Sequence, residues 1–257
     1  MLKLWLVCLA FLPVWGQANT AVPEIPNRIV LATTNWCPYA CSNSDTSPGI
    51  AYEYVKAVLK KKGIDAHIRF YPWTRAIKEV RSGRAHGLLT AVREEAPYLN
   101  FTHTPTMAYR VCFFTQASSD WVFQGAQSLN QVTLGAIRGY GYDPQVDEYI
   151  RDPNSQVSLQ LISGGDEILR FINMLSLKRI DTFLDDQYVV AWQAKSKKVD
   201  FSEVRNAGCL ADNPFYLALN PALEWGDKFI DLLDGAFSNN ENKALLNTIL
   251  KKYTAQD

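Results

Sequence analysis

An alternation of strand-like and helix-like segments is the sequence feature that most constrains how this chain folds. Three segments have the character of strands, at 28–34, 66–71 and 85–90, and the first reads as a buried strand. Two segments of helical period separate them. One starts with Ser47 as its cap and Pro48 in its first turn, and the other spans 74–81. The order β-α-β-α-β predicts a parallel sheet with right-handed crossovers.

The same order recurs in the second half of the chain, without a residue-level repeat. The strands are expected at 131–137, 157–162 and 179–185, and the helices at 143–150, 165–177 and 187–195. Extended segments at 109–115 and 214–220 join the halves, and the final helices, 224–237 and 243–253, return to the first. We therefore predict an α/β fold of two lobes, each a mainly parallel sheet flanked by helices, joined by two extended hinge segments. A ligand cleft is expected between the carboxyl ends of the strands.

The first 18 residues have the form of a secretory signal. Lys3 precedes an apolar stretch of roughly ten residues, and small residues follow up to Ala18. A membrane anchor is the alternative, but the stretch is shorter than the ~20 apolar residues that a spanning helix needs. We therefore expect export, cleavage after Ala18 and a soluble mature protein.

Charge and composition exclude several classes of protein. The 26 Lys and Arg residues balance 26 Asp and Glu residues, so no basic excess indicates a nucleic-acid partner. The hydrophobic content of 47% is that of a globular core rather than of a disordered chain. No phosphate-binding loop occurs, and Pro144 stands where a dinucleotide fingerprint would have its third glycine. We expect no cofactor.

Four cysteines remain after the first 18 residues, and an even number in an exported protein indicates disulfides. Cys37 and Cys41 lie four residues apart with Pro38 between them, where a local bridge can form. Cys112 and Cys209 would then make a long-range bridge, although four cysteines allow three pairings. A zinc site is the alternative, but the spacing is not C-x-x-C and the three histidines are scattered. We expect no metal.

Five blocks of the sequence, taken in order, resemble bacterial periplasmic solute-binding proteins of type II, family 3. They are RIVLATTNWCPY, PGIAYEYVKAVLKKKGI, FYPWTRAIKEVRSGRAHGLLTA, LGAIRGYGYD and RIDTFLDD. The resemblance implies the periplasmic-binding-protein type II fold, with lobe 1 at 24–112 and 215–257 and lobe 2 at 113–214. It also implies a periplasmic location and a small polar solute, such as an amino acid or a related amine or carboxylate. The expected partner is an inner-membrane ABC permease, and the protein is expected to be a monomer.

The resemblance places Asp186 in the ligand site. Asp186 lies five residues after Asp181, and amino-acid-binding members of the family contact the α-amino group of the ligand with an Asp at this place. A carboxylate in a partly dry cleft attracts an ammonium more strongly than a carboxylate in water does. The alternative is that Asp185 and Asp186 cap the helix that follows.

The run from Arg138 to Asp143 is a second candidate, because Tyr140 and Gly141 lie between a strand and a helix. Glycines there let the backbone approach a ligand, and free N–H groups at the helix start attract an anion such as a carboxylate. The alternative is a plain turn in which Asp143 caps the helix.

Aromatic and basic residues that follow the strands of lobe 1 are further candidates for ligand binding. Family members place an aromatic side chain in the pocket at each of the Trp36 and Trp73 positions, although both tryptophans are also plausible core residues. The resemblance points to Arg93, near Thr90, as the residue that grips an α-carboxylate bidentately. Arg75 is the substitute, because Arg93 comes earlier in the chain than the family pattern has it.

Reversible capture of a solute for a transporter is the function we expect, without catalysis. One alternative is an enzyme on the same scaffold, like the cyclohexadienyl dehydratases, for which Asp186 and Glu94 are the candidate carboxylates. Another is the ligand-sensing part of a signalling system. The sequence has neither a G-x-S-x-G nor an H-E-x-x-H motif, which favours binding over catalysis.

Overall fold

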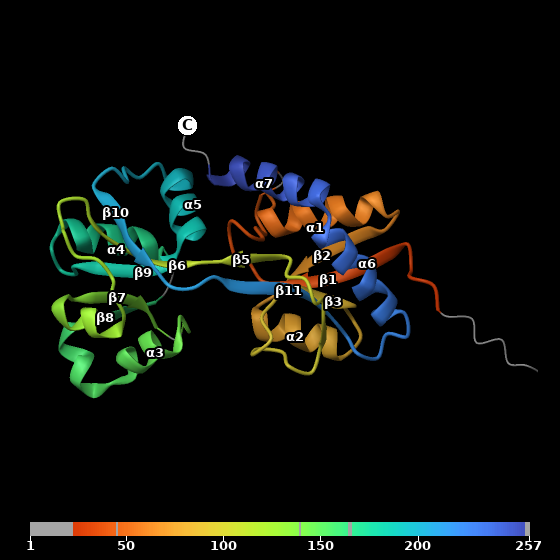
Figure 1. Cartoon of the computed structure of the whole chain (residues 1–257), viewed down its shortest axis with the longest axis horizontal. Coiled ribbons are helices and arrows are strands. Elements are labelled where there is room, and N and C mark those ends of the chain that lie inside the picture. The colour runs from red at the N-terminus through yellow and green to blue at the C-terminus, as the bar shows by residue number, and fades with distance from the viewer. Residues whose placement is uncertain (1–22, 45, 139, 164–165, 255–257) are drawn as a thin grey trace, which may run out of the picture.

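Two separate β-sheets divide the chain into two lobes that lie side by side along the long axis of the molecule (Figure 1). The structure is a computed structural model that describes residues 23–44, 46–138, 140–163 and 166–254. The two-lobed α/β fold confirms the prediction. The expected signal at 1–18 lies outside the described residues. Within the described residues, no helix combines the length and the apolar character that a membrane crossing requires.

Lobe 1 is built on a six-stranded sheet with the order β2-β1-β3-β11-β4, in which β5 also pairs with β11. β1 runs parallel to both β2 and β3, as the β-α-β-α-β order predicts. β11 is antiparallel to all of its partners. The strands are β1 (Arg28–Thr33), β2 (Asp65–Phe70), β3 (Gly87–Ala91), β4 (Asn100–Phe101), β5 (Met107–Tyr109) and β11 (Asn213–Leu219).

Four helices cover this sheet, and their apolar faces form its core. They are α1 (Ile50–Lys61), α2 (Trp73–Arg81), α6 (Gly226–Ser238) and α7 (Asn240–Thr254). Tyr54 and Leu59 of α1 pack with Phe229 of α6 and Tyr253 of α7 in one buried cluster. The last two helices therefore return to lobe 1, as the sequence predicts.

Gly49, rather than the predicted Ser47, caps α1. The φ of Gly49 is 118°, where side chains are strained, and a Cβ atom there would lie 2.4 Å from the carbonyl oxygen of Tyr39. That same carbonyl accepts a hydrogen bond of 2.9 Å from the N–H of Ala51. The prediction for Ser47 is wrong because this close approach fixes the helix start at Ile50. It also holds the loop after β1 against the helix.

Lobe 2 repeats the plan with a five-stranded sheet of order β10-β6-β9-β7-β8. β7 runs parallel to β8 and β9, whereas β6 is antiparallel to β9 and β10. The strands are β6 (Val111–Gln116), β7 (Leu134–Ile137), β8 (Leu159–Ile162), β9 (Thr182–Asp186) and β10 (Val204–Cys209). The helices are α3 (Pro144–Arg151), α4 (Glu167–Ser176) and α5 (Gln187–Lys197), with 3-10 turns η1 (Ala126–Gln131) and η2 (Pro153–Ser158).

The chain crosses between the lobes twice, at Arg110 and at 210–212. Both predicted extended segments take part, but they also enter the sheets as the antiparallel strands β5, β6 and β11. The guanidinium of Arg110 binds both carboxylate oxygens of Asp212, with 2.8 Å from Nη2 to Oδ2. The two crossings are therefore tied to each other beside the cleft. The lobe boundaries expected after 112 and 214 fall inside β6 and β11.

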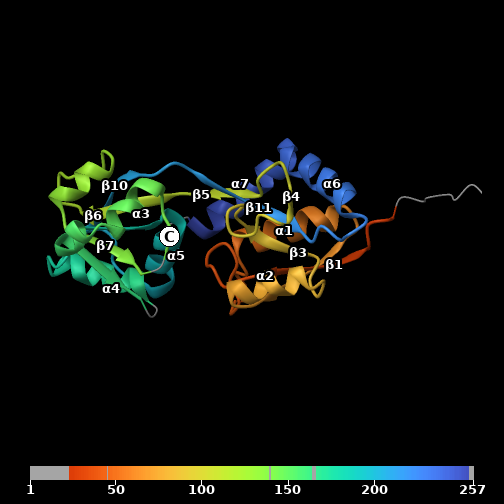
Figure 2. The same cartoon turned by 90° about the horizontal axis from the view of Figure 1, so that it is seen from below.

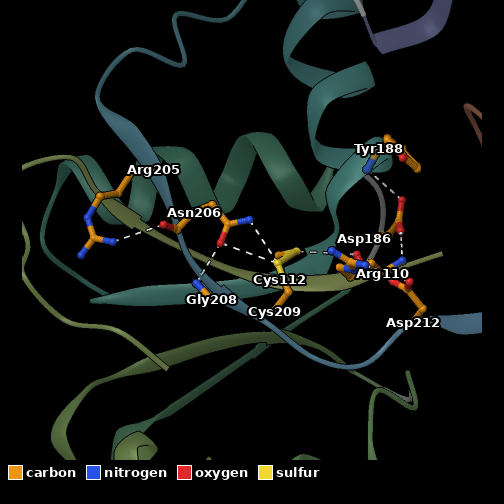
Figure 3. Close-up of a disulfide and its surroundings, with 9 residues drawn as sticks. All are labelled: Arg110, Cys112, Asp186, Tyr188, Arg205, Asn206, Gly208, Cys209 and Asp212. Carbon is orange, nitrogen blue, oxygen red and sulfur yellow. Dashed lines mark hydrogen bonds and ion pairs between the residues drawn. A yellow bond between two sulfur atoms is a disulfide. The ribbon is translucent and has the colours of Figure 1, made fainter. Parts of the chain in front are cut away.

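Two disulfides join the cysteines in the predicted pairing. Cys37–Cys41 closes the loop after β1, and Cys112–Cys209 links facing residues of β6 and β10 (Figure 3). β10 is the edge strand of the sheet of lobe 2. The long-range bridge therefore fastens an edge strand close to the point where the chain leaves this lobe.

The lobes also touch through their helices. α7 of lobe 1 reaches across to α5 of lobe 2, and both views of the molecule show these helices as neighbours (Figure 1, Figure 2). The rings of Trp192 and Tyr253 are 5.5 Å apart at this contact. Beneath it, Tyr39 of lobe 1 lies 6.3 Å from Tyr188 of α5, ring centre to ring centre. One side of the cleft is therefore closed by aromatic packing.

Candidate functional site

A cleft of about 460 Å³ lies where the two lobes meet, which is an ordinary size for a small-molecule site. Its walls come from the ends of β1 and β3 in lobe 1 and of β7 and β9 in lobe 2. Parallel strands deliver their carboxyl ends to one edge of a sheet, so side chains far apart in sequence converge here. Six of the eight predicted ligand residues line the cleft: Trp36, Trp73, Thr90, Tyr140, Gly141 and Asp186.

Asp186 is buried at the end of β9, with 3% of its surface exposed, and its carboxylate accepts four hydrogen bonds. The N–H groups of Tyr188 and Val189 donate to it at 2.9 Å and cap α5. The hydroxyl of Tyr39 donates at 2.9 Å. The N–H of Arg110 donates at 3.0 Å (Figure 3). The capping role considered from the sequence is thus present. Burial raises the pKa of Asp186 and these donors oppose that rise.

Asp185, one residue earlier, also lines the cleft and has fewer partners. It is 7% exposed, and within the described part of the chain one donor reaches it, the N–H of Asp186 at 2.6 Å. Burial raises the pKa of Asp185 to about 7, and the negative charges of Asp186 and Glu167 add to that rise. From the sequence, Asp185 is predicted only as a possible helix cap.

Glu95 supplies the carboxylate on the lobe 1 side of the cleft. Its side chain is exposed and lines the cleft after β3, next to Trp73. Partial desolvation raises the pKa of Glu95, a hydrogen bond from the Trp73 side chain opposes that rise, and the charge of Glu94 adds to it. Glu95 was not predicted as a site residue, although it follows a predicted strand of lobe 1.

The two predicted arginines lie outside the cleft lining. Arg93 donates from Nη2 to the carbonyl oxygen of Thr102 at 2.9 Å and stacks over the ring of Tyr216, 4.4 Å from its centre. Arg75 is exposed, lies 3.6 Å from a carboxylate oxygen of Glu79 and stands over the ring of Tyr71. Neither arginine is brought together with the other predicted ligand residues.

The start of α3 is occupied by acidic side chains of its own. Asp143 accepts from the N–H of Gln145 at 2.9 Å and caps the helix. Asp147 accepts from the N–H of Tyr142 at 3.0 Å. These carboxylates occupy the helix start at which the sequence predicts an anion-binding site. The cap alternative for Asp143 is therefore present in the structure.

Aromatic side chains form much of the remaining wall. Trp36 and Trp73 are half-buried, and Trp36 packs against Tyr39, with 4.2 Å between ring centres, and against the edge of Tyr109. Tyr140 is 60% exposed at the mouth of the cleft. Such rings offer stacking and cation–π contacts to a solute. Trp36 and Trp73 thus combine core packing with exposure to the cleft.

The lining of the cleft suits binding. Carboxylates of both lobes face it, and the described residues that line it include no Lys, Arg or His. Within the described residues, no group of three His, Cys, Asp or Glu side chains is placed to hold a metal ion. The hydroxyl of Thr90 is hydrogen-bonded at 3.0 Å to that of Thr33 beneath the cleft floor.

Solved structures of solute-binding domains superpose on most of the chain. The second substrate-binding domain of GlnP from Lactococcus lactis, in an open conformation, has a TM-score of 0.68 at 16% identity, over 92% of this chain and 99% of its own. An ancestral cationic amino acid solute-binding protein has a TM-score of 0.67 at 13% identity, over 89% and 96%. A histidine kinase sensor domain similar to periplasmic binding proteins has a TM-score of 0.62 at 15% identity, over 88% and 95%.

These likenesses concern the fold. The chain has the architecture of solute-binding domains, which confirms the predicted periplasmic-binding-protein type II fold. No protein-family model matches the sequence, and no curated protein matches it.

Proposed function

We propose that this protein captures a small polar solute in the cleft between its lobes and releases it unchanged. The observation that carries this proposal is that the walls of the cleft come from strand ends of both lobes. A solute bound there contacts both lobes and favours their closure, because it stabilises the state in which it makes the most contacts. The fold of the substrate-binding domain of GlnP supports the same reading.

The proposal includes a location and a partner. We place the mature protein in the periplasm, as a monomer that delivers its solute to an inner-membrane ABC permease. The predicted signal at 1–18 and the likeness to a substrate-binding domain support this placement. A sensory partner is the second candidate, and the likeness to a histidine kinase sensor domain favours it. Uptake of the labelled solute by cells lacking the gene separates the two, since loss of the transporter component abolishes uptake.

A thermal-shift screen of the mature chain tests solute capture. A micromolar binder at millimolar concentration stabilises the folded state by about 4 kcal/mol, which a melting curve resolves. Gly141→Trp places a large side chain beside the cleft and should remove the shift. Gly235→Trp is the matched control, because a Cβ at Gly235 meets nothing within 4 Å. No shift with any amino acid, amine, carboxylate or short peptide would contradict the proposal.

Mass spectrometry of the recovered solute tests the absence of catalysis. The pKa of Asp185, raised to about 7, is one that a general acid or base could use, so the enzyme alternative has a specific observation behind it. We expect the solute to return with unchanged mass after prolonged incubation. A product whose yield falls in Asp185→Asn would establish the enzyme instead.

A further inference from the structure

We propose that the solute is an organic cation that carries N–H groups and no carboxylate, held by Asp185 of lobe 2 and Glu95 of lobe 1. This inference rests on the proposed function and names the chemical class of the solute. It differs from the sequence-based expectation, in which an arginine of lobe 1 grips a carboxylate and Asp186 holds an ammonium.

The charge of the cleft lining indicates the charge of the solute. Three carboxylates line the cleft, at Glu95, Asp185 and Asp186, and the described lining residues include no basic side chain. Lys197 lines an adjoining hollow that shares Asp185, and its ammonium lies 3.4 Å from a carboxylate oxygen of Asp166. Bringing like charges together in a binding site costs several kcal/mol. An anionic group on the solute would therefore be repelled, and a cationic group attracted.

The arginines nearest the cleft are already bound to other groups of the protein. Arg93 is held by the carbonyl oxygen of Thr102 and by aromatic rings, as described above. Arg110 is held by both oxygens of Asp212. A bidentate clamp on a solute carboxylate would need one of these guanidinium groups to leave its partner. Neither of them lines the cleft.

Backbone N–H groups at helix starts, the other common partners of a carboxylate, are largely occupied near the cleft. At the start of α5, Asp186 occupies the N–H groups of Tyr188 and Val189. At the start of α3, Asp143 occupies the N–H of Gln145. Two of the helix starts that border the cleft are therefore already filled by carboxylates of the protein.

Unused acceptor positions on the two carboxylates favour a solute with N–H donors over a quaternary ammonium. Oδ1 of Asp185 accepts the N–H of Asp186, and within the described residues no donor reaches Oδ2. Glu95 receives a hydrogen bond from the Trp73 side chain. A carboxylate can accept about four hydrogen bonds, so both groups have acceptor positions to offer. An ammonium or guanidinium can fill these positions, whereas a quaternary ammonium cannot.

The two carboxylates that would hold the cation belong to different lobes. Glu95 follows β3 of lobe 1, and Asp185 ends β9 of lobe 2. Trp36, Trp73 and Tyr140 line the same cleft, and aromatic rings can make cation–π contacts. When Asp185 is ionised, its charge and that of Glu95 repel one another, and a cation bound to both replaces that repulsion by attraction. The same cation therefore favours closure.

Matched pairs of solutes that differ only in a carboxylate test the inference. We would measure calorimetric affinities of the mature protein for agmatine against arginine and for cadaverine against lysine. The wider panel would contain aliphatic amines and guanidines up to spermidine, choline, glutamate and succinate. At least one carboxylate-free amine or guanidine should bind, and at least roughly tenfold more tightly than the amino acid that differs from it by a carboxylate.

Variants of the two carboxylates provide the second readout. Asp185→Asn keeps an oxygen for the N–H of Asp186, and Glu95→Gln keeps the polarity of an exposed side chain. Each should weaken binding of the amine at least roughly tenfold, because each removes one charge from its site. Glu224→Gln, at an exposed position before α6, is the matched control and should bind the amine like the parent protein.

The possible failures of the two proposals are distinguishable. Arginine or lysine binding as tightly as its carboxylate-free partner would overturn the inference and leave solute capture intact. That result would assign the carboxylate to N–H groups at the start of α2, which has no side-chain cap. Tight binding of glutamate or succinate, or of choline in preference to every amine with an N–H, would overturn it as well. Binding of no solute at all would overturn the proposed function and the inference with it.

Discussion

The hydroxyl of Tyr39 donates a hydrogen bond of 2.9 Å to the carboxylate of Asp186 and so joins lobe 1 to lobe 2. Tyr39 is fully buried, and burial together with the charge of Asp186 raises its pKa, which keeps the hydroxyl protonated as a donor. The same carboxylate accepts from the N–H of Arg110 in the hinge. Asp186 thus connects the β1 loop, the hinge and α5 at the back of the cleft.

Tyr39→Phe should destabilise the protein through this contact. The variant keeps the ring and leaves a buried carboxylate without one of its donors, a loss that costs about 1–3 kcal/mol. Urea denaturation measures the change. Tyr188→Phe is the matched control, because it makes the same change on a neighbouring ring whose backbone N–H, rather than its hydroxyl, binds Asp186. Equal effects of the two variants would show that the Tyr39 hydroxyl has no special role.

Asp185→Asn should stabilise the protein at neutral and alkaline pH. The pKa of Asp185 is raised from 3.8 to about 7 in the folded state, so folding favours the protonated form. Its contribution to stability is full below pH 4 and is lost as pH rises through 7, at up to about 1.4 kcal/mol per pH unit. The variant cannot ionise and avoids this loss.

Unfolding free energies of both proteins at pH 5 and pH 8 test this expectation. The ionisable groups around Asp185 include Asp186, Glu167, Tyr39, Tyr140, Tyr142 and Lys197, and all are present in both proteins. Their own titration therefore largely cancels in the difference. The advantage of Asp185→Asn should be larger at pH 8. A difference that is the same at both pH values would mean that Asp185 titrates normally.

Affinity for a cationic solute should rise with pH between about 5.5 and 8. Asp185 must lose its proton to hold a cation, and with its pKa near 7 a large part of the population is protonated below that pH. Binding should therefore release protons near pH 6.5, which calorimetry detects when buffers of different ionisation enthalpy are compared. In Asp185→Asn the proton release should disappear. Release that persists in the variant would assign it to another group.

Removal of the long-range disulfide should cost more stability than removal of the local one. Cys112 and Cys209 are 97 residues apart in the chain, and closing a loop of that length corresponds to about 4.7 kcal/mol. The same relation gives roughly 2 kcal/mol for the loop from Cys37 to Cys41. Urea denaturation of the two paired Cys→Ser variants compares them. A larger loss from the local bridge would contradict the loop-length account.

Much of the fold could be predicted from local patterns. β1 and β3 are mostly buried runs, whereas β2 alternates exposed polar residues with buried apolar ones. Gly63 follows the last residues of α1 and marks its end. β10 was missed because Val204–Cys209 is a largely polar edge strand, stabilised by its pairing with β6 about 90 positions earlier. No local periodicity indicates such a pairing.

The candidate site was predictable only as far as strand ends locate it. Trp36 and Trp73 follow predicted strands, and both line the cleft. Which of Asp185 and Asp186 takes the N–H groups of α5 depends on the backbone turn after β9, which the sequence does not indicate. The orientation of Arg93 depends on Tyr216, which β11 brings beside it from the far end of the chain.

A crystal structure of the mature protein with the tightest-binding solute of the thermal-shift screen is the most direct test of capture between the lobes. We predict that the solute lies against Trp73 on one side and Asp185 on the other, with the lobes drawn closer together around it. A solute bound outside this cleft, or one that contacts a single lobe, would contradict the account.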